Sequence, residues 1–79
     1  MTTSPAQLRA ARVMLGLSQV DVAARASVSV PTVKRAEADS GIKVSDEVRA
    51  AIGSVLEAAG VEFTNGDMPG VRLRRKKPK

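Results

Sequence analysis

The chain has 79 residues and a formal net charge of +5, and it contains neither cysteine nor histidine. This composition excludes disulfide bonds, thiolate chemistry and the usual zinc ligands. A chain of this length has room for one domain with a small core, which is only marginally stable unless a second subunit buries more apolar surface. We therefore expect one small domain that oligomerises.

The positive charge is concentrated at the C-terminus. Six of the 13 Lys and Arg residues lie in residues 72–79, and residues 1–71 sum to a charge of −1. A basic segment attracts polyanions such as nucleic acids. A basic terminus can also serve only to keep a protein soluble, so charge alone leaves both interpretations open.

No segment of the sequence is typical of export or of membrane insertion. Residues 1–13 lack the apolar centre of a signal peptide, and no apolar run approaches the roughly 20 residues that a membrane helix needs. We therefore expect a cytoplasmic protein without a membrane partner.

Two helices are predicted in the first 26 residues. Ser4, Pro5 and Gln7 have the spacing of a capping box, which predicts a helix over residues 5–15 that ends before Gly16. Ser18 then caps a second helix, whose apolar residues are small enough to let neighbouring helices approach closely.

A third helix follows after only two or three residues. Ser29 is its predicted N-cap, and Val33 and Ala36 point inward at helical spacing. The residues left on the outer and leading faces are Val30, Pro31, Thr32, Lys34 and Arg35. Two helices joined so closely cross at a steep angle, and the second can then project as a rod about as wide as the DNA major groove. This arrangement is typical of a helix-turn-helix.

The last part of the chain predicts a longer helix followed by a β-hairpin. Ser45 caps the helix, whose apolar residues recur at helical spacing as far as Gly60. The pattern then changes to alternation around a turn at residues 65–70. The apolar face of this hairpin consists of Val61, Phe63, Val71 and Leu73. Because two strands alone are marginal in water, we expect this face to pack on the fourth helix or against a second subunit.

The sequence assembles no catalytic pair and no glycine-rich loop that could hold a phosphate. The carboxylates stand at helix starts and turns, where capping and dipole roles account for them without acid-base work. We expect no enzymatic activity and no cofactor.

Residues 8–37, LRAARVMLGLSQVDVAARASVSVPTVKRAE, resemble the Cro and phage-repressor type of helix-turn-helix, also called the XRE family. The shared features are an arginine, the run Gly-Leu-Ser-Gln, a small-residue helix, a Val-Ser turn and a closing glutamate. The resemblance implies a mainly α fold, with a four-helix lambda-repressor-like helix-turn-helix domain over residues 1–60. A C-terminal β-hairpin for dimerisation or packing over residues 61–74 and a basic tail over residues 75–79 would follow, as in many small bacterial regulators.

The same resemblance implies a sequence-specific transcriptional regulator that binds double-stranded DNA. It would act as a dimeric (auto)repressor on a two-fold operator, through the helix that starts at Ser29. The residues implied in DNA binding are Ser18, Gln19, Ser29, Val30, Pro31, Thr32, Lys34 and Arg35. Arg12 and Glu37 match a family ion pair between the first and third helices, which we expect to be partly buried.

Two features depart from the usual family pattern. Ser27 stands where the turn usually has glycine, and a left-handed conformation there would cost about 1–2 kcal/mol. Val30 and Pro31 offer no hydrogen bonds to bases, so recognition would depend more on DNA shape. A second interpretation also stays open, namely an antitoxin or anti-regulator whose fourth helix and hairpin bind a partner protein.

Overall fold

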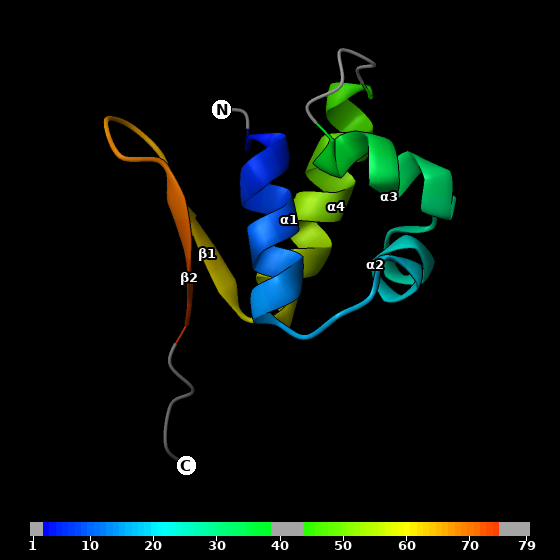
Figure 1. Ribbon diagram of the computed structural model, residues 1–79, viewed down its shortest axis with the longest axis horizontal. Coiled ribbons are helices and arrows are strands. Elements are labelled where there is room, and N and C mark those ends of the chain that lie inside the picture. The colour runs from blue at the N-terminus through cyan, green and yellow to red at the C-terminus, as the bar shows by residue number, and fades with distance from the viewer. Residues whose placement is uncertain (1–2, 39–43, 75–79) are drawn as a thin grey trace.

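The computed structural model describes residues 3–38 and 44–74. Helices α1 and α4 lie side by side, with α2 and α3 on one side of α1 and the hairpin on the other (Figure 1). The elements in chain order are α1 (Pro5–Met14), α2 (Gln19–Ala26), α3 (Val30–Glu37), α4 (Asp46–Ala59), β1 (Val61–Thr64) and β2 (Gly70–Leu73). The mainly α fold of four helices with a C-terminal hairpin is therefore confirmed.

A serine precedes each of the four helices as its N-cap. The hydroxyl of each serine accepts a hydrogen bond from the backbone N–H three residues later, which satisfies one donor that the helix leaves unpaired. The four caps are Ser4, Ser18, Ser29 and Ser45. The helices thus begin where the spacing of the serines predicts.

The turn between α2 and α3 contains a residue in the left-handed region. Ser27 has φ 57° and ψ 42°, although its side chain disfavours this conformation by about 1–2 kcal/mol. The N–H of Val28 donates to the Ala23 carbonyl at 3.0 Å and closes the turn. The chain therefore keeps the turn geometry expected of glycine with a serine in its place.

The core lies where the four helices meet β1. Each helix contributes two buried apolar residues and β1 contributes one. These residues are Leu8, Ala11, Val22, Ala23, Val33, Ala36, Ile52, Leu56 and Val61. Because Val33 and Ala36 both face the core, α3 is anchored along one side and its opposite side faces outward.

The antiparallel hairpin packs against the helices of its own chain. Val61 pairs with Leu73, and Phe63 pairs with Val71. Val61 is buried, and Phe63 and Val71 pack against the core, whereas Leu73 is 53% exposed. β1 contacts α4 and β2 contacts α1. Three of the four apolar residues therefore cover helices of the same chain.

Gln7 joins α1 to the turn end of the hairpin, where Thr64 pairs with Gly70. Its buried side-chain amide donates to the carbonyls of Thr64 and Gly70 at 2.9 and 2.8 Å. Its side-chain carbonyl accepts from the Ser4 N–H at 2.9 Å, as the predicted capping box requires. One side chain thus caps α1 and binds the pair of hairpin residues next to the turn.

The basic tail predicted over residues 75–79 lies outside the described residues. Within residues 3–38 and 44–74, no helix has the length and apolar character that crossing a membrane requires.

Candidate DNA-binding surface

An ion pair between Arg12 and Glu37 connects α1 to the last residue of α3. The Arg12 Nε donates to one oxygen of Glu37 at 2.7 Å, and a second guanidinium nitrogen donates to the other oxygen at 3.0 Å. The two side chains are only 16% and 4% exposed. Arg12 also donates to the Leu17 carbonyl at 3.1 Å, so the pair reaches the loop before α2. A bidentate, buried contact of this kind fixes the relative orientation of the two side chains as well as their distance.

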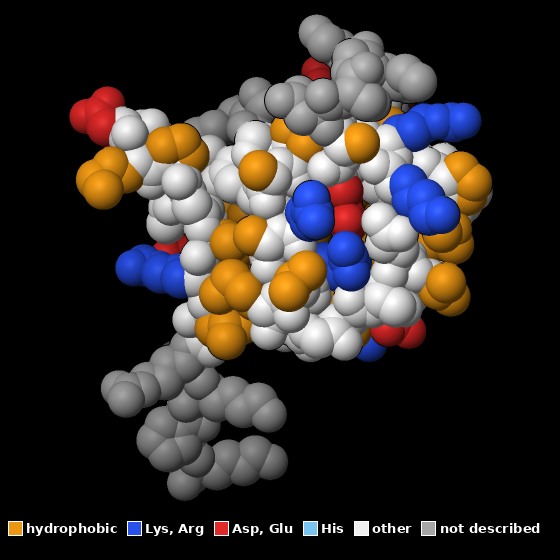
Figure 2. Space-filling model, in the orientation of Figure 1, with side chains coloured by type: hydrophobic (Ala, Val, Ile, Leu, Met, Phe, Trp, Pro, Cys, Tyr) orange, Lys and Arg blue, Asp and Glu red, His pale blue; other side chains and the backbone are white. Residues whose placement is uncertain are grey.

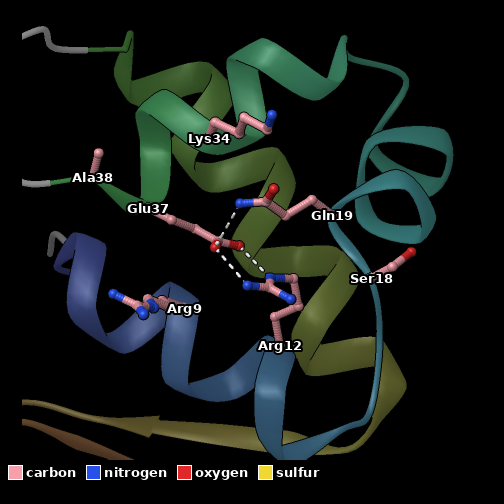
Figure 3. A pocket seen from close by; sticks show the side chains of 7 residues that line it. All are labelled: Arg9, Arg12, Ser18, Gln19, Lys34, Glu37 and Ala38. Carbon is pink, nitrogen blue, oxygen red and sulfur yellow. Dashed lines mark hydrogen bonds and ion pairs between the residues drawn. The ribbon is translucent and has the colours of Figure 1, made fainter.

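Gln19, the first residue of α2, also contacts Glu37. Its amide nitrogen donates to Glu37 at 3.3 Å, on the oxygen that receives the second bond from Arg12. Figure 3 shows the three side chains converging from α1, α2 and α3. Glu37 is therefore the point at which the orientation of α3 is fixed relative to both other helices.

A hollow of about 440 Å³ opens over this ion pair. It is lined by Arg9, Arg12, Ser18, Gln19, Lys34, Glu37 and Ala38. Three of these residues are cations and one is an acid, so the hollow has a net positive charge. Figure 2 shows Lys and Arg side chains gathered around acidic atoms near the middle of the same face. Such a surface attracts a phosphate backbone.

Arg9 was not among the residues implied by the sequence, yet it lines this hollow from α1. Its spacing alone gives no signal, because an exposed arginine on an amphipathic helix is ordinary. The position becomes informative once Arg12, three residues later on the same face of α1, is known to point toward α3.

The outer side of α3 presents three exposed residues. Pro31, Lys34 and Arg35 are exposed, while Val33, Ala36 and Glu37 of the same helix are buried. Lys and Arg can donate to O6 and N7 of guanine in the major groove. α3 is therefore packed against the rest of the domain on one side, and its charged side is accessible to solvent.

Val30 and Thr32 are less accessible for contacts with DNA than the sequence predicts. Val30 is half-buried and packs against the core. The Thr32 hydroxyl is hydrogen-bonded to the Ser29 hydroxyl at 2.7 Å. Both residues lie in the first turn of α3, at its leading end, and are less exposed than the three residues above. Their contacts with DNA stay a prediction.

Ser18 and Asp21 form a reciprocal cap at the start of α2. The Ser18 N–H donates to the Asp21 carboxylate at 2.9 Å, and the Asp21 N–H donates to the Ser18 hydroxyl at 3.0 Å. The backbone N–H of Ser18, followed by its side chain, lowers the pKa of the Asp21 carboxyl below its ordinary value. Because the Ser18 N–H and the Ser18 hydroxyl oxygen both bond to Asp21, the hydroxyl proton is the group left to donate to an external acceptor.

The sequence pattern of a helix-turn-helix family matches residues 8–52, which is more than half of the chain. The chain belongs to the XRE and Cro type of helix-turn-helix proteins. It is a DNA-binding transcriptional regulator. A comparison with curated proteins gives no match.

The matched span of this helix-turn-helix regulator runs from α1 into α4. It contains α2, the turn at Ser27, α3 and every residue that lines the hollow. The part of the chain that defines the family is thus the part that forms the basic surface, and the hairpin lies outside it.

Proposed function

We propose that the protein is a sequence-specific regulator that inserts α3 into the DNA major groove. The observation that carries this proposal is the two-sided character of α3, with Lys34 and Arg35 exposed and Val33 and Ala36 buried. A helix anchored in this way can present its charged side to base edges without moving. Pro31 would add apolar contact with a thymine methyl group.

The basic hollow between α1 and α3 would hold the phosphate backbone beside that groove. Arg9, Lys34 and Gln19 line it, and the start of α2 opens into it. The unpaired N–H groups of a helix N-terminus favour anions. Glu37 does not repel the phosphate strongly, because its charge is matched by Arg12 at 2.7 Å. The phosphate contacts would set the register in which α3 meets the bases.

We further propose that two copies bind a two-fold operator, with their α3 helices in successive major grooves about 34–36 Å apart. A small domain gains affinity and specificity when two copies read two half-sites together. Bound dimers would repress by occluding a promoter, including the promoter of the protein's own gene.

A footprint on the DNA upstream of the protein's own gene tests this proposal. We expect two protected segments whose centres lie one helical turn apart, about 10 base pairs. A scrambled fragment of the same length is the control and should show no defined protection. A single protected segment would contradict the dimeric arrangement. Equal protection of both fragments would contradict sequence-specific binding.

A further inference from the structure

One face of α4 has features that its own chain does not explain. A hollow of about 440 Å³ on this face is lined by Thr3, Asp46, Arg49, Ala50, Gly53, Ser54 and Glu57. Residues 46, 50, 53 and 57 follow one line along the helix, because they are spaced by four, three and four positions. The middle of this line is made of small residues, and its ends are charged.

Gly53 leaves space on this face that the chain does not use. It is buried at mid-helix, and a Cβ atom built at this position would meet nothing within 4 Å. Gly53 is also absent from the glycines with positive φ. Neither packing within the chain nor backbone conformation therefore requires glycine here, although glycine weakens a helix relative to alanine. A close approach from outside would account for it.

Arg49 on the same face has an unsatisfied polar atom. Its Nε is buried without a hydrogen-bond partner. Among residues 3–38 and 44–74, Arg49 takes part in no ion pair. A buried guanidinium N–H without an acceptor is costly, so the side chain would gain by turning outward to an acceptor. Because the Nε atom is itself buried, a carboxylate of another molecule can bind it only after such a rotation.

We propose that this face of α4 binds the same face of a second copy, with the two helices antiparallel across a two-fold axis at Gly53. Arg49 lies four residues before Gly53, and Glu57 lies four residues after it. With a rise of about 1.5 Å per residue, Arg49 of one copy is level with Glu57 of the other, about 6 Å from the axis on each side. Arg49 and Glu57 are thus complementary across the axis, as a two-fold interface requires. Asp46 lies seven residues before Gly53, about one helical turn farther from the axis than Arg49.

A second copy fits this face better than an unrelated partner does. The two-fold arrangement satisfies both arginines with both glutamates, and Gly53 at the axis lets the helix backbones approach closely. The core of this small domain is modest, so additional buried surface would also stabilise each copy. This inference rests on the dimeric part of the proposed function and adds the surface that forms the dimer.

Charge reversal tests the proposed pairing. We expect Arg49→Glu and Glu57→Arg each to weaken dimerisation at least about tenfold in sedimentation equilibrium, because each variant places like charges together on both sides of the axis. The double variant Arg49→Glu/Glu57→Arg restores opposite charges and should return dimerisation close to that of the original chain. Arg25→Glu, at an exposed position on α2, is the matched control and should leave dimerisation unchanged.

Cysteine cross-linking gives a second, independent test. The chain has no cysteine of its own, and the space around position 53 can hold a cysteine side chain. An axis at this residue would bring two such side chains within disulfide reach, about 4 Å between their Cβ atoms. We expect Gly53→Cys to form a disulfide-linked dimer on mild oxidation much faster than Ala24→Cys, which places the thiol on exposed α2.

The outcomes separate this surface from the dimer itself. A dimer that none of the α4 variants affects, and that cross-links no faster at position 53 than at position 24, would overturn the inference and leave dimeric DNA binding intact. A chain that remains monomeric both alone and on its operator would overturn the inference and the dimeric part of the proposed function. Failure of the double variant to recover dimerisation, with its circular dichroism unchanged, would overturn the proposed pairing.

Discussion

Two arginine–glutamate pairs in this molecule have the same chemistry and very different surroundings. Arg12 and Glu37 are 16% and 4% exposed and connect α1 to α3, whereas Arg72 and Glu62 are 69% and 45% exposed and face each other on the hairpin. Removing one partner of a buried pair costs about 3–5 kcal/mol, while exposed pairs contribute about 0–1 kcal/mol. The buried pair therefore fixes the orientation of helices in the helix-turn-helix, whereas the exposed pair contributes little to the stability of the hairpin.

The largest loss of stability is expected when the buried ion pair loses one of its charges. Glu37→Gln should lower the free energy of unfolding by about 3 kcal/mol, because Arg12 stays charged and loses its ionised partner. Urea unfolding followed by circular dichroism measures this loss. In the control Arg12→Met/Glu37→Met no charge is left unpaired, and this variant should recover most of the stability. A loss below about 1 kcal/mol for Glu37→Gln would show that the pair resembles the exposed one.

Hydrogen bonds rather than charge connect the hairpin to the helices. Gln7→Leu should cost about 2 kcal/mol, because the carbonyls of Thr64 and Gly70 lose the amide that satisfies them. Amide hydrogen exchange should become faster in β1 and β2. Gln7→Glu sharpens the test, since it keeps an acceptor for the Ser4 N–H and removes both donated bonds. If hairpin exchange stays unchanged in both variants, packing alone holds the hairpin in place.

The exposed ion pair should contribute little to the free energy of unfolding. Arg72→Ala is expected to change the free energy of unfolding by less than about 0.5 kcal/mol, because both side chains are largely in water and screened by salt. Glu62→Ala should give a similar value, and the same urea experiment measures both. A loss above about 1.5 kcal/mol would remove the contrast between the two regions.

The smallest effect concerns the exposed cap of α2 and depends on pH. The pKa of Asp21 is lowered in the folded protein from an ordinary value of 3.8, so the ionised carboxylate stabilises the fold above that pH. This stabilisation is lost as the pH falls through the folded pKa. The difference in urea midpoint between the original chain and Asp21→Asn should therefore be constant above about pH 5 and shrink below about pH 4. A constant difference down to the most acidic pH would show that the charge of the Asp21 carboxylate does not stabilise the fold.

Features that depend on local spacing could be predicted from the sequence. The four serine caps and the hairpin with its apolar face follow from positions a few residues apart, and the ion pair of Arg12 with Glu37 followed from the family pattern. The contacts of Gln7 with Thr64 and Gly70 could not be predicted, because they join residues 57 and 63 positions apart. The place of Arg9 in the basic hollow and the contact of Val30 with the core could not be predicted for the same reason, because both are decided by how α1 and α3 pack.

In the proposed mode of binding, the exposed side of α3 reads base sequence while the basic hollow holds the DNA backbone. Fluorescence anisotropy titrations of the original chain, Arg35→Ala and the control Arg25→Ala on an operator duplex and a scrambled duplex test it most directly. We expect Arg35→Ala to lose about tenfold or more in affinity for the operator and little for the scrambled duplex, since one good base contact contributes about 1–3 kcal/mol. Equal losses on both duplexes would contradict this mode of binding.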